Sequence, residues 1–155
     1  QVYCLVEVAV ELSGADLPLA KLVERLTQKL QRMLQCESVQ LFIVDHTAAE
    51  LWAYSSQERI SLKQSVAGYC AIHTKALCLP ESKACPEWSP DWDDSNAGKP
   101  LLLQPVLWKG ETIAVFQASA RQSRAFKHKD TTLLHAISRQ IAPHLGNAFR
   151  WQQLL

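Results

Sequence analysis

The stretch Ser65-Val66-Ala67-Gly68-Tyr69-Cys70-Ala71-Ile72-His73-Thr74-Lys75-Ala76, followed by Leu79-Pro80-Glu81, separates a β-rich segment from an irregular one. Gly68 stands where we expect a short helix to begin, over residues 68–75, with a brief strand over 76–79. A helix N-terminus presents unpaired backbone N–H groups and the positive end of the dipole, which suits an anionic small molecule. Gly68 has no side chain, so the backbone can approach such a ligand closely. Most helix N-termini bind water or a cap instead, and this alternative stays open.

Regular patterns on both sides of this stretch predict further helices and strands. Apolar residues at three- and four-residue spacing predict an amphipathic helix over residues 18–35, with Asp16 as N-cap, and a long helix over 129–155 that contains Pro143. Residues 2–12 are expected to be helical, with a strand as the alternative. Apolar and β-branched runs predict five further strands, over residues 38–44, 50–56, 59–62, 101–108 and 112–118, of which 59–62 is short.

Residues 81–100 have the composition of a long irregular loop. This segment is rich in Pro and Asp and carries Trp88 and Trp92, which is typical of a lid or binding loop inside a compact domain. The strands before and after it are linked as hairpins, and helices flank them. This order predicts a mainly antiparallel sheet and an α+β fold.

Composition narrows the class of protein. At 155 residues we expect a single domain over 1–155, with 1–16 as an N-terminal connecting segment and 145–155 as a C-terminal connecting helix. The net charge of +1 argues against nucleic acid or a membrane as partner, and no apolar run reaches the roughly 20 residues that span a bilayer. Five cysteines without a C-x-x-C pair indicate a reducing compartment, the cytoplasm. The start at Gln1 indicates a piece of a longer polypeptide.

The order and spacing of several short motifs resemble the GAF domain, the small-molecule-sensing module of phosphodiesterases, cyclases, histidine kinases and phytochromes. The resemblance extends over residues 17–151, and residues 79–105 are most similar to the cyclic-nucleotide-binding GAF domains of phosphodiesterases. The motifs are Cys36–Asp45, Glu50-Leu51, Val66–Ala71, Leu79-Pro80-Glu81, the loop 85–95, Leu101–Val106, and Phe126 with Asp130. The resemblance implies a central antiparallel sheet of about six strands. The N- and C-terminal helices would cover one face, and the short helix and long loop would enclose a ligand pocket on the other.

The resemblance also implies a ligand and the residues that contact it. It indicates a regulatory, non-catalytic domain that binds cAMP or cGMP and controls an attached signalling domain. Ser89 takes the place of the aromatic residue that stacks on the purine, and Trp88 or Trp92 can substitute for it. The implied contacts are Ser38, Ser55, Ser56, Val66, Ala67, Gly68, Trp88, Ser89, Trp92, Asp93, Asn96 and Gln117.

Two other functions compete with ligand sensing. A GAF domain without a ligand can serve as a scaffold that forms a homodimer through its terminal helices. A free methionine sulfoxide reductase needs a nucleophilic Cys just before Gly68, where this chain has Ala67, and Cys70 lies three residues later. No metal site is expected, because His73, Cys78 and Cys85 do not have zinc-ligand spacing.

Overall fold

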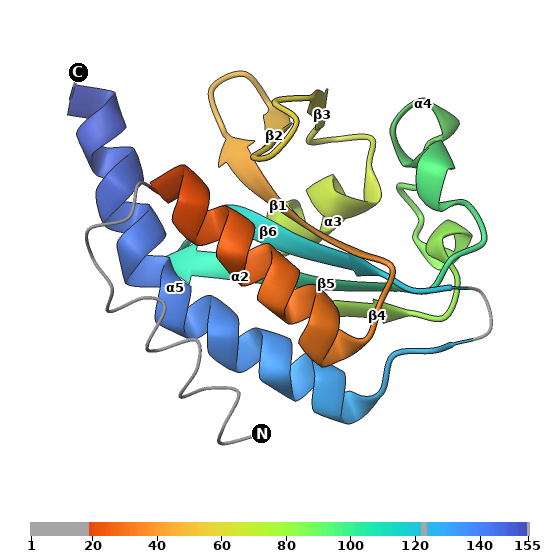
Figure 1. The fold of residues 1–155 in the computed structure, drawn as a ribbon. Helices are drawn as coiled ribbons and strands as arrows, with labels where there is room; N and C mark the ends of the chain where they lie inside the picture. Colours follow the sequence, from red (N-terminus) through yellow and green to blue (C-terminus); the bar gives the residue numbers. More distant parts are fainter. Residues whose placement is uncertain (1–18, 122–123, 155) are drawn as a thin grey trace.

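Hairpin-linked strands form one six-stranded antiparallel sheet in the computed structural model (Figure 1). The structure describes residues 19–121 and 124–154, and for residues 149–154 it describes the backbone alone. The order across the sheet is β3-β2-β1-β6-β5-β4. The strands are β1 Ser38–Asp45, β2 Glu50–Ala53, β3 Arg59–Ser61, β4 Leu77–Leu79, β5 Leu101–Trp108 and β6 Glu111–Ser119. The predicted sheet of about six antiparallel strands is confirmed.

Two long helices cover one face of this sheet: α2 Leu19–Leu34 and α5 His128–Leu154 (Figure 1). Leu26, Leu30 and Leu34 of α2 are almost fully buried, because their spacing of four residues places them on one side of the helix. They pack with alternate residues of β1, Leu41 and Ile43, in the larger apolar cluster of the molecule. This arrangement of the two helices on one face was predicted from the sequence.

The other face carries the short helix α3 Val66–His73 and a second apolar cluster. Helix α3 begins two residues earlier than predicted, because Ser65 is its N-cap and its Oγ accepts a hydrogen bond from the Gly68 N–H, with 3.0 Å between Oγ and N. A Cβ added at Gly68 would collide with the carbonyl group of Leu62. The missing side chain at Gly68 therefore lets α3 pack against the chain that precedes it, and the contact of Gly68 with a ligand stays a prediction.

The segment expected to be irregular contains helical turns. It holds η1 Ser82–Ala84, α4 Pro90–Asp93 and η2 Asp94–Asn96. The Ser89 Oγ accepts a hydrogen bond from the Asp91 N–H, at 3.3 Å between Oγ and N, and Pro90 occupies the first helical position. A capping Ser followed by Pro is a start signal for a helix, so the sequence held the information for α4.

Strand β2 is shorter than predicted, since it ends at Ala53 and the chain turns over residues 54–56. The Gln57 N–H donates to the Ala53 carbonyl, and Gln57 adopts a left-handed conformation with φ of 63°.

Helix α5 continues through Pro143, which cannot donate to the carbonyl four residues earlier. No described helix has the length and apolar character that a membrane span requires. The expectations for residues 2–12, for Asp16 and for the end of the chain after residue 148 lie outside the described side chains.

Candidate functional site

The N-terminus of α3, where an anionic ligand was expected, binds a carboxylate of the chain itself. The Val66 N–H donates to Asp93, with 3.2 Å from N to Oδ2 and 3.4 Å to Oδ1. Asp93 Oδ2 also accepts from the Ser89 N–H at 3.0 Å. One side chain thus joins the first turn of α3 to the first turn of α4. An external anion can reach the Val66 N–H only after Asp93 has moved.

Asp93 is buried, with 5% of its surface exposed. Burial raises the pKa of its carboxyl group above the ordinary value of 3.8, and the two backbone N–H donors offset part of this rise. A buried carboxylate with two donors is a partly compensated charge. Both backbone donors would need another acceptor if Asp93 moved away.

The sheet face that α3 covers is polar where the two central strands, β1 and β6, pair Ser38 with Ser119, and it is apolar further in. Ser38 and Ser119 are register partners on β1 and β6, and their Oγ atoms lie 2.6 Å apart. Gln117, 7% exposed, is two residues from Ser119 and therefore on the same side of β6. Phe42 of β1 shares this face and belongs to the apolar cluster beneath α3. The structure thus places two predicted ligand contacts, Ser38 and Gln117, on the face that α3 covers.

Trp88 packs against the same apolar cluster, with the ammonium group of Lys83 5.1 Å from its ring centroid. Its indole Nε1 is buried and has no hydrogen-bond partner among the described residues. A buried donor without an acceptor costs about 1–3 kcal/mol, so this N–H is a position at which a ligand or water acceptor would be stabilising. Of the two tryptophans expected to stack on a ligand, Trp88 is the one that faces inward.

Other predicted contacts have local roles or lie elsewhere. The Trp92 side chain is 39% exposed to solvent. The backbone carbonyl of Asn96 accepts a hydrogen bond from the Ser82 Oγ, with 2.8 Å between the two oxygens. Ser55 lines a groove of about 770 Å³ between α2 and the sheet, on the face opposite α3, and Ser56 Oγ accepts from the Glu58 N–H. Ser55 lies outside the expected site because β2 ends before it, and Ser56 has a local role in the turn.

The cysteines near this site are poor nucleophiles. Cys70 is fully buried and Cys85 is 3% exposed. Burial raises the pKa of both thiols above the usual value, so they stay protonated at neutral pH, and the thiolate is the reactive form. Burial also raises the pKa of Cys36 to about 11. Within residues 19–121 and 124–154, no three His, Cys, Asp or Glu side chains are placed to hold a metal ion together.

Asp93 was predicted as a ligand contact, but its hydrogen bonds to the backbone of α4 and α3 were not predicted. A signal for the bond within α4 was present, because an acid four residues after an N-cap Ser lies one helical turn away, within reach of the N-cap N–H. The second partner, Val66, is 27 residues away in the chain, and no local pattern pointed to it.

Comparisons with known proteins agree with this fold. A family model described as the GAF domain matches residues 18–145. The GAF domain of a phosphoenolpyruvate-protein phosphotransferase from Coxiella burnetii is similar in structure, with a TM-score of 0.85 and 16% identity, over 99% of this chain and 96% of that chain. The free methionine-R-sulfoxide reductase from Neisseria meningitidis, solved with its substrate, is also similar. Its TM-score is 0.72 and its sequence identity 17%, over 90% of this chain and 84% of that chain. At sequence identities this low, the structural similarity shows a shared fold and no shared function. The comparison with curated proteins found no match.

Proposed function

The chain belongs to the GAF domain family, and we propose on this basis that it is a regulatory domain that binds a cyclic nucleotide, cAMP or cGMP, and controls an attached signalling domain. GAF domains are generally regulatory, and structures similar to this chain include a part of a methyl-accepting chemotaxis protein, residues 122 to 287 of that protein. The choice of cyclic nucleotide rests on the resemblance of residues 79–105 to phosphodiesterase GAF domains.

The observation that carries the proposal is the Asp93 carboxylate on the Val66 N–H at the N-terminus of α3. In this proposal the ligand's cyclic phosphate replaces the carboxylate at that donor. The base lies against Trp88, where its ring nitrogens or carbonyl supply an acceptor for the unpartnered indole N–H. Ser38, Gln117 and Asn96 provide further polar contacts from the sheet and the segment beyond α4.

Displacement of Asp93 also supplies a regulatory change. The carboxylate is the contact that joins α4 to α3, so its release frees the segment that contains α4. A ligand that binds the released state better than the closed state shifts the population toward it.

The experiment is a thermal unfolding series with cAMP and cGMP on the wild type, Asp93→Asn and Asp91→Asn. A specific ligand at 100 times its Kd stabilises the folded state by about 2.7 kcal/mol. We expect one nucleotide to stabilise the wild type, and to bind Asp93→Asn more tightly because the competing negative charge is gone. Asp91, exposed on the same helix, serves as the charge-matched control and should leave the Kd unchanged. If neither nucleotide stabilises the wild type or Asp93→Asn, cyclic nucleotide binding is contradicted.

A scaffold without ligand is the second candidate, and one observation favours it. Val66, Cys70, Leu103 and other side chains fill the space beneath α3 as an apolar cluster, and the chain supplies the partners of the α3 N-terminus. In this case the domain would form a homodimer through its terminal helices and bind no nucleotide. The thermal series separates the two candidates.

A further inference from the structure

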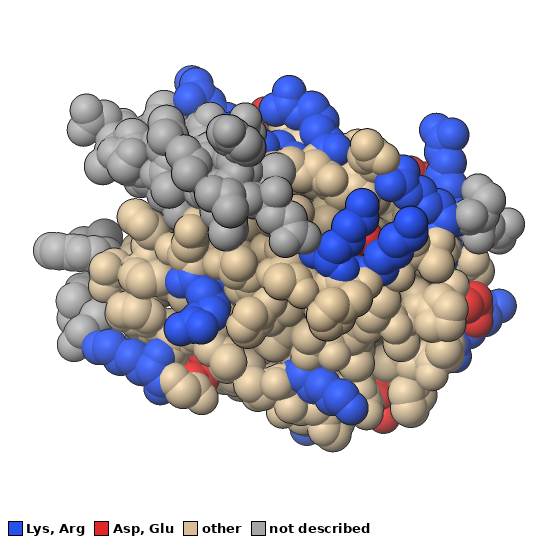
Figure 2. All heavy atoms as spheres, turned by 90° about the horizontal axis from the view of Figure 1, so that it is seen from below, with Lys and Arg blue, Asp and Glu red and all other residues tan. Residues whose placement is uncertain are grey.

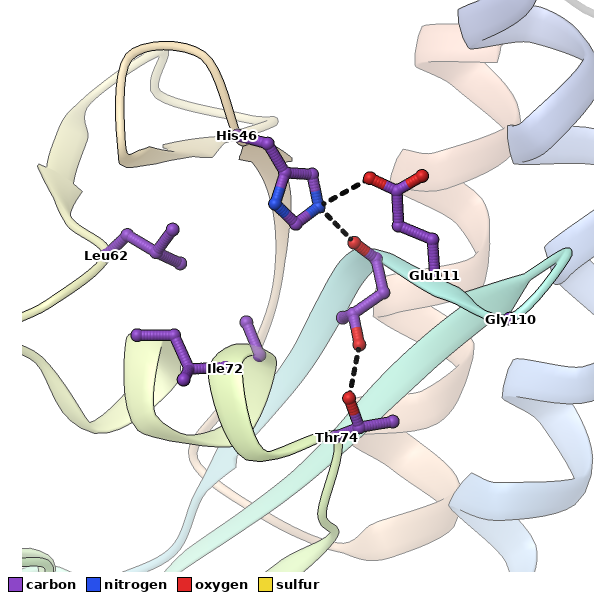
Figure 3. Close-up of a pocket in the computed structure, with 8 residues that line it drawn as sticks. His46, Leu62, Ile72, Thr74, Gly110 and Glu111 are labelled. Carbon is purple, nitrogen blue, oxygen red and sulfur yellow. Dashed lines mark hydrogen bonds and ion pairs between the residues drawn. The ribbon is translucent and has the colours of Figure 1, made fainter.

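We propose that a pocket at the opposite end of α3 binds a small organic cation, a primary ammonium group on a short branched apolar body. This α3 C-terminal pocket has a volume of about 300 Å³ and lies between the end of α3, the turn after β1 and the turn between β5 and β6 (Figure 3). Helix α3 separates it from the Asp93 site, since the eight residues of α3 extend about 12 Å. The proposal is therefore independent of cyclic nucleotide binding.

One wall of the pocket is apolar. Leu62 and Ala71 are nearly buried, whereas Ile72 is 52% exposed and points across the opening toward Leu62 (Figure 3). A large aliphatic side chain exposed at the edge of a pocket loses water contact when an apolar ligand covers it, which is favourable. This wall suits the body of a ligand with a few branched carbons.

The facing wall is polar and contains several hydrogen-bond acceptors. His46 Nε2 lies 2.9 Å from the Thr112 carbonyl oxygen and 3.1 Å from Glu111 Oε1. Both partners are acceptors, so Nε2 carries a proton, and in the neutral ring Nδ1 is then an acceptor. The Nδ1 edge of the ring faces Leu62 and Ile72 across the pocket (Figure 3). The second carboxylate oxygen of Glu111 adds another acceptor.

The electrostatics favour a cation. The pocket lies at the C-terminal end of α3, the negative end of its dipole, and the acidic residue Glu111 is among those that line it. No Lys or Arg is among the described residues that line it. Lys109, in the adjacent turn, has its ammonium 5.6 Å from the centroid of the Trp108 ring. An ammonium group has three donors, for which His46 Nδ1 and the Thr hydroxyls are acceptors in this pocket, while the Glu111 carboxylate, on the Nε2 side of the His46 ring, contributes negative charge.

Thr74 provides a separate indication. It is the C-cap of α3 and adopts a left-handed conformation with φ of 51°, which is unfavourable for a β-branched residue. Its Oγ1 is 3.4 Å from Thr112 Oγ1, a long contact that leaves both hydroxyls with capacity for another partner. Helices often end in this conformation, and here the Thr74 N–H donates to the Cys70 carbonyl. This conformation holds a hydroxyl at the boundary between the apolar and polar walls.

The test is an NMR titration of the full chain with 3-methylbutylamine, with 3-methylbutan-1-ol and 3-methylbutanoate as neutral and anionic probes of the same shape. The volume is at the lower end of small-molecule sites, so the amine should bind in the millimolar range. We expect saturable amide shifts at Thr74, Gly110 and Thr112 with the amine, and binding at least fivefold weaker for the alcohol and the acid.

Two variants locate the ammonium group. Glu111→Gln keeps the size of the side chain and removes its charge, and should weaken amine binding at least fivefold. Glu58→Gln removes an exposed carboxylate outside the pocket and should leave the Kd unchanged. Equal binding of amine and alcohol, an unchanged Kd in Glu111→Gln, or shifts that do not saturate would each overturn the proposal. Binding of cAMP or cGMP plays no part in these readouts.

Discussion

Asp93 shows how one buried carboxylate can serve both structure and regulation. It accepts hydrogen bonds from the backbone of α3 and of α4, and it lies where negative charge is favoured by the α3 dipole. Burial nonetheless disfavours its charged form and raises its pKa. The balance between these effects makes the Asp93 contact sensitive to pH and replaceable by another anion.

The raised pKa gives a pH-dependent contribution to stability with a definite sign. Between the ordinary pKa of 3.8 and the raised value, the folded state binds more protons at Asp93 than the unfolded state. The contribution of this residue to the free energy of unfolding therefore falls as pH rises through that window. Asn does not titrate, so the stability of the wild type relative to Asp93→Asn should fall as pH increases from about 3.8.

Urea unfolding of both proteins across pH 3.5 to 7 measures this difference. Asp91→Asn is measured in parallel as a control. It removes an exposed carboxyl group from the same helix and therefore shows the effect of losing one charge without losing the buried contact. A difference between wild type and Asp93→Asn that stays constant, or that grows with pH, would contradict the assignment.

At the scale of elements, α3 depends on close approach to the backbone that precedes it. Ser65 Oγ donates to the Ser61 carbonyl at 2.6 Å and also caps the Gly68 N–H. These contacts hold the first turn of α3 against residues 61–62, and Gly68 is the residue at the contact.

Gly68→Ala should therefore destabilise the protein even though Ala favours helices. Helix propensity alone would stabilise by about 1 kcal/mol. The new Cβ would collide with the Leu62 carbonyl, which is backbone and cannot rotate away. Overpacking of this kind typically costs about 1–3 kcal/mol, so we expect a net loss of stability. The free energy of unfolding from urea titration measures it, and a variant as stable as the wild type would show that the backbone relaxes freely.

At the scale of the whole molecule, the two faces of the sheet differ in chemistry. The face opposite α2 and α5 carries α3 and both proposed sites. The helical face, viewed from below in Figure 2, bears many Lys and Arg side chains and few acidic ones. Helix α2 contributes four basic residues and one acidic residue to it. Among described residues, the exposed large apolar side chains are Ile72, Trp92 and Leu107, and none of them belongs to α2 or α5.

This charge distribution bears on the homodimer, which stays a prediction. Two copies paired through their helical faces would bring like charges together, and salt screens that repulsion. Dimerisation through these helices should therefore strengthen from 50 to 500 mM NaCl. Sedimentation equilibrium measures it, starting from a monomer of 17.4 kDa. A mass of one chain at both salt concentrations would contradict the dimer, and association that weakens with salt would place the interface elsewhere.

Much of the architecture was determined by the sequence alone, for a physical reason. Leucine spacing in α2 and apolar runs such as Leu101–Trp108 are local patterns, and the burial of one face follows from their period. The α+β class and the antiparallel sheet follow from these local patterns and from the hairpin connections, whereas the two helices on one face were implied by the GAF resemblance. The cap of α4 at Ser89 was equally local, and was readable from the residues beside it.

Only the tertiary structure decided what meets at the two ends of α3. Val66 and Asp93 are 27 residues apart, and the C-terminal pocket joins His46, Thr74 and Glu111 from three separate segments. Such contacts depend on strand register and on where each turn ends, which sequence period does not specify. Ser55 left the predicted site for the same reason, because β2 ends at Ala53 and the following turn carries it to the opposite face.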